Sequence, residues 1–380
     1  MRGALLELIT VGFYRFWLAT DIRRHLWSHT AVDGDAFEYT GRGKELLMGF
    51  LFALAILMPI YLAYFLVGLE AERLKAFASI PLVVFFYVFG QFAIYRARRY
   101  RLTRTVWRGV RFWVEGSGWA YAGRAALWAL LMPLTLGLIL PWREAALERY
   151  KMRHSHYGDL PGRFEATGWE FFKQGWWIWL LTVAPLVAGT ILPLLGRFSR
   201  ALSPVSGNAS QVMGLVVILM LLLAPYIYAV FKAVEWRWWM SGIRFGEVRL
   251  ESTLPRGALA GLYWKVFGWL LLITAVFVGY LWACVALMAR LNDVSMAQVF
   301  ASGQLQGSIP MLVLTGIGYL TFILLFNVVM RVYLMRDVWA KLVGSTAVHG
   351  LDAAANVSVR GDLASAVGEG FADGLDVVGF

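Results

Sequence analysis

An aspartate and two histidines near the start of the chain are spaced as neighbours on one helix face. Asp21, His25 and His29 follow one another at intervals of four residues, and side chains four apart lie one above the other on an α-helix. A zinc ion needs three or four convergent nitrogen, sulfur or oxygen ligands. The three residues are therefore candidate metal ligands, although histidines beside lipid headgroups are the favoured interpretation of this pattern.

Beyond this group the sequence offers little that could carry catalysis. The chain has five histidines and a single cysteine, Cys284, which lies inside an apolar run. No serine, threonine or cysteine stands out as a nucleophile with a histidine and an acid to activate it. We therefore predict that the protein is not an enzyme and that it needs no metal or other cofactor.

A dense run of arginines, "RARRYRLTRTVWRGVRF" at 96–112, suggests a different chemistry. On a soluble chain, arginines interleaved with aromatic residues would suggest nucleic acid. Beside an apolar helix they favour anionic lipid headgroups, to which each basic residue contributes about 1 kcal/mol. We expect membrane lipids and no nucleic acid as partners. The candidate lipid-binding residues are Arg96, Arg98, Arg99, Arg101, Arg104, Arg108 and Arg111.

The composition is that of an integral membrane protein. Of the 380 residues, 59% are hydrophobic and 16% are charged, whereas soluble domains average about 45–50% and about 25%. The net charge is +11, and the 18 Trp and 16 Tyr often flank apolar runs, where rings with one polar atom favour the membrane interface. We predict an all-α polytopic membrane protein.

Apolar runs long enough to cross a bilayer, which requires about 20 residues, occur six times. They are Leu46–Leu69, Ala76–Tyr95, Trp176–Leu195, Gln211–Phe231, Val266–Ala289 and Ile309–Met330. No charged residue lies in them, and we interpret their polar residues, among them Gln91, Thr274 and Asn327, as interhelical hydrogen-bonding groups.

The loops between these runs alternate in charge. Residues 96–124 carry eight arginines and one acid, and 142–175 and 232–265 are also rich in basic residues, whereas 291–308 carries only Asp293. Basic loops face the cytoplasm, so the six runs pair into three hairpins that begin and end inside. We therefore predict a bacterial inner-membrane protein with cytoplasmic basic loops and a cytoplasmic C-terminus.

One further apolar run, "AALWALLMPLTLGLILPW" at 125–142, has basic sequence on both sides. If it crossed the membrane, one basic loop would be forced outside, so a re-entrant or shallow segment is favoured over a seventh span. Pro133, Thr135 and Gly137 would form its bend.

Internal similarities indicate two parallel pseudo-repeats. "LATDIRRHLWSHTAVDG" (18–34) resembles "LMRDVWAKLVGSTAVHG" (334–350), "ITVG" (9–12) resembles "LTLG" (134–137), and "GVRF" (109–112) recurs as "GIRF" (242–245). The predicted organisation is a first repeat at 1–142, a second at 143–350 with a full terminal hairpin, and an acidic Gly/Ala-rich tail at 351–380. The tail would either dock on the basic loops or remain disordered.

Four stretches together resemble the YjgN-like family of bacterial inner-membrane proteins, whose function is unknown. They are "FEYTGRGKELLMGF" (37–50), "RTVWRGVRFWVEGS" (104–117), "LTLGLILPWREAALERY" (134–150) and "GEGFADGLDVVGF" (368–380). The resemblance covers nearly the whole chain and implies an inner-membrane location. It supplies no catalytic residue.

Two functions remain open from the sequence. The first is a pore or carrier for a small solute or lipid along the interface of the pseudo-repeats, which predicts a polar-lined cavity there. The alternative is a non-transport membrane scaffold that binds anionic lipids or another membrane protein. A homo-oligomer is possible in either case.

Overall fold

The computed structural model describes residues 2–10, 12–70, 75–196, 209–293, 295, 309–361, 363–365, 370 and 373. The chain divides into two compact units, which are described separately. One comprises Met1–Arg15 and Gly257–Lys341, and the other comprises Phe16–Arg256 and Leu342–Phe380.

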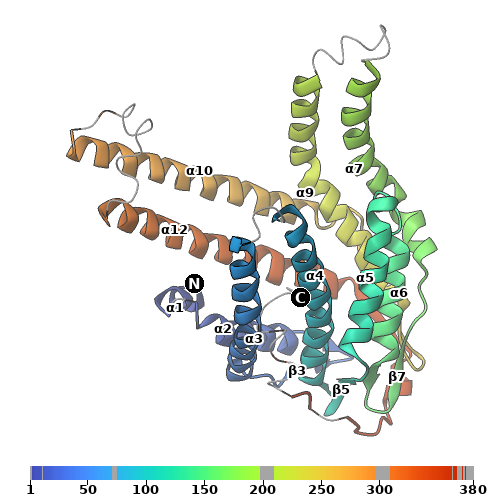
Figure 1. Ribbon diagram of the computed structural model, residues 1–380. Helices are drawn as coiled ribbons and strands as arrows, with labels where there is room; N and C mark the ends of the chain where they lie inside the picture. Colours follow the sequence, from blue (N-terminus) through green and yellow to red (C-terminus); the bar gives the residue numbers. More distant parts are fainter. Residues whose placement is uncertain are drawn as a thin grey trace. The chain divides into compact units, whose positions relative to one another are not determined.

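Helices make up most of the described chain (Figure 1). They are α1 (Arg2–Ile9), α2 (Arg15–Ser28), α3 (Gly43–Glu70), α4 (Lys75–Thr103), α5 (Gly118–Leu134), α6 (Leu140–Arg153), α7 (Gly168–Gly196), α9 (Ala209–Gly242), α10 (Ala260–Leu291), α12 (Ile309–Val329), the π-helix η3 (Met330–Asp337), α13 (Val338–Gly344) and the 3₁₀-helix η4 (Leu351–Ala354).

The prediction of an all-α fold is wrong, because the larger unit also contains an eight-stranded antiparallel sheet in the order β10-β9-β8-β7-β6-β5-β4-β3. The strands, including a small separate β1–β2 pair, are β1 (Ala31–Val32), β2 (Asp35–Ala36), β3 (Glu38–Tyr39), β4 (Thr105–Trp107), β5 (Val110–Val114), β6 (Ser155–Tyr157), β7 (Leu160–Phe164), β8 (Ile243–Phe245), β9 (Val248–Ser252) and β10 (Thr346–His349). Strands of two to five residues are too short to reveal a two-residue alternation of polar and apolar side chains. The strands β4 to β9 also lie in the basic segments 96–124, 142–175 and 232–265, which the charge pattern identified only as loops.

Tight turns and helical hairpins alternate along this sheet. Two-residue turns at 108–109, 158–159 and 246–247 join β4 to β5, β6 to β7 and β8 to β9. Helix pairs follow in the chain between the other neighbours: α3 and α4 between β3 and β4, α5 and α6 between β5 and β6, α7 and α9 between β7 and β8, and α10 and α12 between β9 and β10. Each helix pair thus leaves one strand and returns to the adjacent one.

The first of these turns shows how the sequence ends a strand. Arg108 and Gly109 have φ angles of 48° and 76°, as in a type I′ turn, whose twist matches that of the two strands. The register that results pairs Val106 with Arg111 and Trp107 with Val110.

Five helical segments are long and apolar enough to cross a membrane: Gly43–Phe65, Gly168–Ile191, Met213–Gly242, Ala260–Leu291 and Ile309–Gly344. They overlap five of the six predicted spans. The sixth predicted span, Ala76–Tyr95, lies in α4, which is not one of these segments in the part of the chain that the structure describes. The last two turns of α4 carry Arg96, Arg98, Arg99 and Arg101, which make its C-terminal part strongly polar. The count of six spans is therefore not confirmed.

The run 125–142 does not form one continuous helix. It contains the end of α5, which has 17 residues, and the start of α6, and the two helices lie side by side (Figure 1). At about 1.5 Å per residue, α5 is about 25 Å long, less than the roughly 30 Å of a bilayer core. The hairpin begins after β5 and ends at β6, where Phe112 pairs with Tyr157. The hairpin therefore begins and ends at neighbouring strands of the sheet, and its shallow entry into a membrane stays a prediction.

Pro133, Thr135 and Gly137 lie at the turn between α5 and α6, where sequence analysis expected the bend. The Thr135 hydroxyl donates to the Leu131 carbonyl at 2.9 Å, and Gly137 has a φ of 81°. The turn after α1 repeats this arrangement, with Thr10 donating to Leu6 at 2.7 Å and Gly12 at a φ of 86°. The threonine and the glycine of the two similar tetrapeptides therefore adopt the same local arrangement.

The two GxRF motifs do not occupy equivalent positions. Gly109 lies in a turn and the three residues after it begin the second strand of a hairpin, β5, whereas Gly242 ends α9 and the residues after it form the first strand of a hairpin, β8. The two motifs are therefore similar in sequence but not in structure. The division of the chain into two repeats at residue 142 stays a prediction from the sequence.

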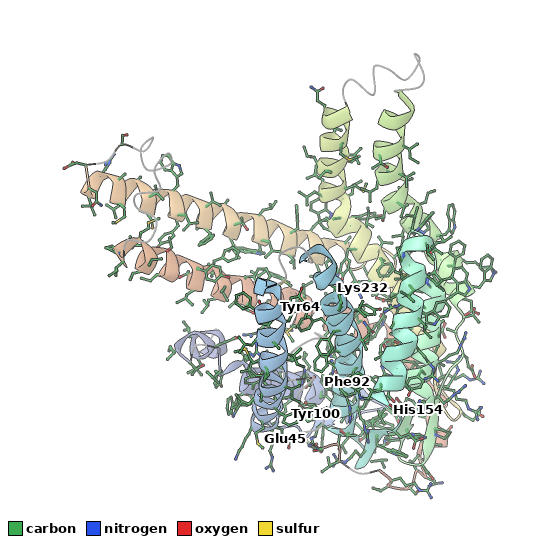
Figure 2. All side chains as sticks on the ribbon, in the orientation of Figure 1. Glu45, Tyr64, Phe92, Tyr100, His154 and Lys232 are labelled. Carbon is green, nitrogen blue, oxygen red and sulfur yellow. The ribbon has the colours of Figure 1, made fainter. Side chains whose placement is uncertain are left out.

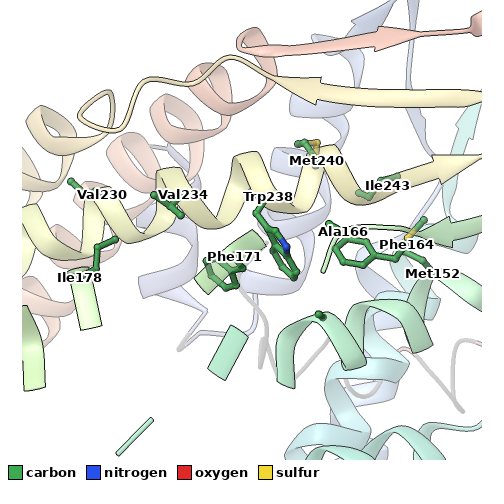
Figure 3. Packing of buried hydrophobic residues seen from close by; sticks show 11 residues of the cluster. Met152, Phe164, Ala166, Phe171, Ile178, Val230, Val234, Trp238, Met240 and Ile243 are labelled. Carbon is green, nitrogen blue, oxygen red and sulfur yellow. The ribbon is translucent and has the colours of Figure 1, made fainter. Parts of the chain in front are cut away.

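The main core of the larger unit lies between α6, α7, α9 and β7 (Figure 3). Trp238 stacks on Phe171 with ring centroids 4.6 Å apart, and its edge meets Phe164 at 5.1 Å. The Trp238 indole nitrogen also donates to the Thr167 carbonyl at 2.9 Å. This cluster attaches the start of α7 and the end of α9 to the sheet.

In the smaller unit, α10 and α12 pack along each other. The Tyr280 hydroxyl on α10 donates to the Leu314 carbonyl on α12 at 2.8 Å, and its ring lies over Gly318, where any Cβ would collide with it. The unit also includes α1, whose Glu7 forms an ion pair with Arg331 at 2.6 Å.

Candidate functional site

The arginines of 96–112 are mostly engaged within the larger unit. Arg104 bonds Glu45, Arg101 contacts Asp373, and Arg98 lies 4.0 Å from Glu148. Arg108 contacts Asp35 at 2.5 Å and Asp33 at 2.8 Å, and Arg111 donates to the Thr103 carbonyl at 2.6 Å. Arg96 lies over the Phe92 ring at 5.2 Å, and Arg99 is half-buried. Four of the seven therefore neutralise carboxylates of the same chain.

One buried ion pair joins the start of α3 to the end of α4. Arg104 donates to Glu45 from Nε at 3.0 Å and from its terminal nitrogen at 2.9 Å. The Tyr100 hydroxyl donates to the same carboxylate at 2.8 Å, and Figure 2 shows Glu45 and Tyr100 together at the end of these helices. Burial raises the pKa of Tyr100, and the neighbouring carboxylate of Glu45 adds to this rise.

A second cluster holds the C-terminal segment. Arg23 on α2 and Arg101 on α4 both contact the carboxylate of Asp373, with Arg23 donating to Oδ1 at 3.1 Å and the Arg101 Nε lying 3.4 Å from Oδ1. Arg23 also donates to the Tyr39 hydroxyl at 3.3 Å. The Asp373 side chain is only 1% exposed. Burial alone would lower the pKa of Arg23, but the charge of Asp373 outweighs it and the pKa is raised.

A third cluster lies between α4 and α6. Glu148 contacts Lys151 one turn along α6, and Arg98 approaches from α4. The three side chains are 9%, 12% and 19% exposed. Burial acts to raise the pKa of Glu148, but the charges of Lys151 and Arg98 outweigh it and hold that pKa below its usual range. The charge of Glu148 in turn outweighs burial at Lys151 and raises the pKa of that lysine.

Exposed cations and tryptophans gather instead at the starts of α5 and α7 and along α6 and β7. Trp119 and Trp169, in the first turns of α5 and α7, are 58% and 51% exposed. Arg124 lies over the Tyr150 ring at 4.4 Å, and Lys173 over Trp169 at 5.5 Å. We call this set the α5–α7 surface; its members are Trp119, Arg124, Arg149, Arg153, Arg163, Trp169 and Lys173, all of which are exposed.

The candidate metal ligands are not assembled into a site. Asp21 faces Arg24 at 3.7 Å, and the His29 ring bonds the His25 carbonyl at 2.7 Å. Within the residues that the structure describes, no three His, Cys, Asp or Glu side chains converge as metal ligands would.

One polar residue of the apolar runs differs from expectation, whereas the interhelical role of Gln91 and Thr274 stays a prediction. Asn327 donates to the Ile323 carbonyl of its own helix at 3.0 Å rather than to a neighbouring helix. Gln91 is half-buried and Thr274 is exposed. The interhelical bond in this part of the chain comes from Tyr280 instead.

Sequence analysis missed Asp373, Glu148 and the α5–α7 surface. Glu148 sits among closely alternating acids and bases, and Asp373 lies in an acidic stretch far in the chain from its cationic partners, so charge counting could pair neither of them. The surface did leave a signal, since Trp119 and Trp169 each follow a glycine at the start of a helix, and Arg124 and Lys173 come about one turn later. Such tryptophans are typical of helices that enter a membrane interface.

The apolar helices and the short-stranded sheet at their ends define a mostly helical membrane protein. Residues 2–373 match the model of a family described as a bacterial protein of unknown function, DUF898. The chain belongs to this family, which is the YjgN-like family that the sequence motifs indicated. No curated protein and no solved structure matches the chain.

Proposed function

We propose that the protein is a non-transport scaffold of the bacterial inner membrane that binds anionic lipid headgroups through its α5–α7 surface. The observation that carries this proposal is the pairing of exposed Trp119 and Trp169 with the exposed cations Arg124 and Lys173. Indole rings favour the headgroup region, and basic side chains beside it attract anionic lipids.

The burial of the long helices supports a lipid-facing protein. In each of the five candidate spans, no more than 17% of the most apolar 18-residue stretch is buried inside the protein. Exposed apolar side chains of this extent need lipid tails or another membrane protein to cover them.

The pore or carrier hypothesis gains less support. It predicts a polar-lined cavity between the pseudo-repeats, whereas a described hollow of about 250 Å³ is lined by Lys265, Gly268, Trp269 and Leu272, all from α10. This hollow is open to the surface and is not a passage between repeats.

The proposal includes a topology in which the sheet lies on the cytoplasmic face and the α5–α6 hairpin dips into that face. Glu115→Cys and Asp159→Cys, made singly in a Cys284→Ser background, flank this hairpin at exposed positions. We expect an impermeant thiol reagent to label both only after the inner membrane is opened. Ser203→Cys, in the loop predicted outside, is the control and should label in intact cells lacking an outer-membrane barrier. Labelling of Glu115→Cys and Asp159→Cys from opposite faces would refute the shallow hairpin.

The lipid preference can be tested by removing cations from the α5–α7 surface. The double variant Arg124→Gln/Lys173→Gln should lower the ratio of phosphatidylglycerol to phosphatidylcholine bound by about 30-fold, since the two cations together contribute about 2 kcal/mol and about 1.4 kcal/mol corresponds to tenfold. The measurement is native mass spectrometry of the full chain released from nanodiscs that contain equal amounts of both lipids.

Arg108→Gln provides a matched control for Arg124→Gln, because it removes the same charge from a residue already bonded to Asp33 and Asp35. We expect Arg108→Gln to leave the lipid ratio nearly unchanged. An equal fall for both single variants would mean that the arginines of 96–112, rather than the α5–α7 surface, recruit the lipid.

A further inference from the structure

A row of basic residues crosses the sheet from β7 to β10. Arg163 on β7 pairs in register with Arg244 on β8, and Arg244 pairs with Arg249 on β9. Arg249 in turn pairs with His349 on β10. Directly opposite residues of antiparallel strands have Cα atoms about 4.5–5.5 Å apart and side chains on the same face. We call these four residues the cation row.

The cation row lies on the outer face of the sheet. Three of its members are exposed and Arg244 is half-buried. The residues next to them along the strands, Phe164, Ile243 and Val248, are buried. Because successive side chains of a strand point to opposite faces, the row and the core lie on opposite sides of the sheet, and a ligand can reach the row from outside.

The alignment of the arginines is unfavourable for the fold itself. Like charges directly opposite each other destabilise a sheet. Glu165 neutralises Arg244, whose Nε lies 3.2 Å from its carboxylate, whereas Arg163 and Arg249 form no ion pair and no side-chain hydrogen bond with the described part of the chain. Two cations beside a third, with one acid between them, favour an anionic ligand as the missing partner.

Acids on the same face restrict the shape of such a ligand. Glu251 lies two residues beyond Arg249 on β9, and Glu165 lies two residues beyond Arg163, where its backbone N–H still donates to the Gly242 carbonyl at 2.9 Å. Both acids are therefore about 7 Å from the row along the strands, and they are 70% and 61% exposed. They would repel a broad anionic surface such as a bilayer, whereas a narrow anion lying across the strands meets only the row.

A linear chain of phosphate groups has this narrow shape. Guanidinium groups bind phosphate oxygens through parallel N–H donors, and the repeated charges of the chain match cations that recur on successive strands. Single-stranded nucleic acid is less suitable, because its bases stack on aromatic side chains, and neither the row nor its two flanking acids include one.

We infer that Arg163, Arg244 and Arg249 form a binding site for a soluble oligophosphate, which lies across β7, β8 and β9 and extends toward His349. The inference goes beyond the proposed lipid scaffold and does not rest on it. Only Arg163 also belongs to the α5–α7 surface, so the test uses variants of Arg244 and Arg249.

Calorimetry of the full chain in uncharged detergent, with inorganic tripolyphosphate as the probe, tests this site. We expect tripolyphosphate to bind at least about tenfold more tightly than orthophosphate, because it contacts more than one arginine and each adds a charge-assisted hydrogen bond. Arg244→Gln and Arg249→Gln should each weaken its binding at least about tenfold for the same reason. Glu251→Gln should strengthen binding, since it removes a flanking negative charge.

Arg256→Gln is the matched control, because this exposed arginine lies four residues beyond β9 and outside the cation row. It should leave tripolyphosphate binding nearly unchanged. Equal weakening by Arg249→Gln and Arg256→Gln would overturn the inference, as would equal affinities of wild type for tripolyphosphate and orthophosphate. A wild type that ignores tripolyphosphate, with an Arg249→Gln variant that retains less phosphatidylglycerol from nanodiscs, would assign the row to lipid and overturn the inference as well.

Thermal unfolding gives a second readout, which separates a ligand site from a structural role. A ligand that binds only the native state raises the unfolding temperature, so tripolyphosphate should stabilise wild type and have little effect on Arg249→Gln. Without ligand, Arg249→Gln should be at least as stable as wild type, because it removes a repulsion between opposite cations. A clear loss of stability in the ligand-free variant would show that Arg249 is structural and contradict the inference.

Discussion

Glu148→Ala should lower the free energy of unfolding of the detergent-solubilised chain by about 3–5 kcal/mol, because it leaves two buried cations without their shared anion. Glu148 contacts Lys151 and lies 4.0 Å from Arg98, and all three side chains are largely buried. The measurement is unfolding in increasing mole fractions of sodium dodecyl sulfate, followed by circular dichroism.

A matched control separates this effect from the loss of any ion pair. Glu165→Ala breaks a pair with Arg244 at 3.2 Å in which the glutamate is 61% exposed, and exposed pairs contribute only about 0–1 kcal/mol. The double variant Glu148→Leu/Lys151→Met should recover part of the loss, because apolar residues of similar volume can replace the buried Glu148–Lys151 pair while Arg98 still lacks its anion. Equal effects of Glu148→Ala and Glu165→Ala would show that the buried cluster is not stabilising.

The Glu148 effect should also depend on pH. Because the folded pKa of Glu148 is lowered by Lys151 and Arg98, its contribution is fully present above the ordinary glutamate pKa of about 4.3. It is lost as the pH falls through the lower, folded value. The difference between wild type and Glu148→Ala should therefore be constant near neutral pH and shrink in acid.

Trp238→Ala should cost a similar amount, about 3–5 kcal/mol, which is typical of removing a buried tryptophan. Trp238 is 2% exposed, stacks on Phe171 and meets Phe164. Its indole also satisfies the Thr167 carbonyl just before α7, so the variant loses a hydrogen bond as well as packing. The same unfolding assay measures the change.

Trp176→Ala is the control, because it removes the same side chain at a position on α7 where the tryptophan is 49% exposed. We expect a change of less than about 1 kcal/mol, because most of the side chain faces the surroundings rather than the core. Comparable losses for the two variants would mean that the Trp238 cluster does not hold α7 and α9 to the sheet.

The sequence predicted the helices well and the sheet not at all. Apolar runs such as Gln211–Phe231 are long enough to give an unambiguous signal, and each lies within a helix of the structure. The strands are short and lie between helices, so their partners are set by tertiary contacts that no local pattern encodes. The parity of the charged loops nevertheless indicated that 125–142 returns to its starting side, and α5 and α6 do return to the sheet.

The candidate site was predicted only by residue type. The arginine run was recognised, but the sequence could not show that Arg101 and Arg104 meet Asp373 and Glu45, which lie far from them in the chain. Pairing of this kind depends on the folded backbone. Arg124 and Lys173, which lie outside the arginine run, are instead exposed cations.

The order of strands in the sheet has a consequence for biosynthesis. Each strand pairs with the strand made just before it, and helical hairpins separate every second pair. Each strand from β4 onward therefore finds its partner already synthesised, so the sheet can grow strand by strand in the order in which the chain leaves the ribosome.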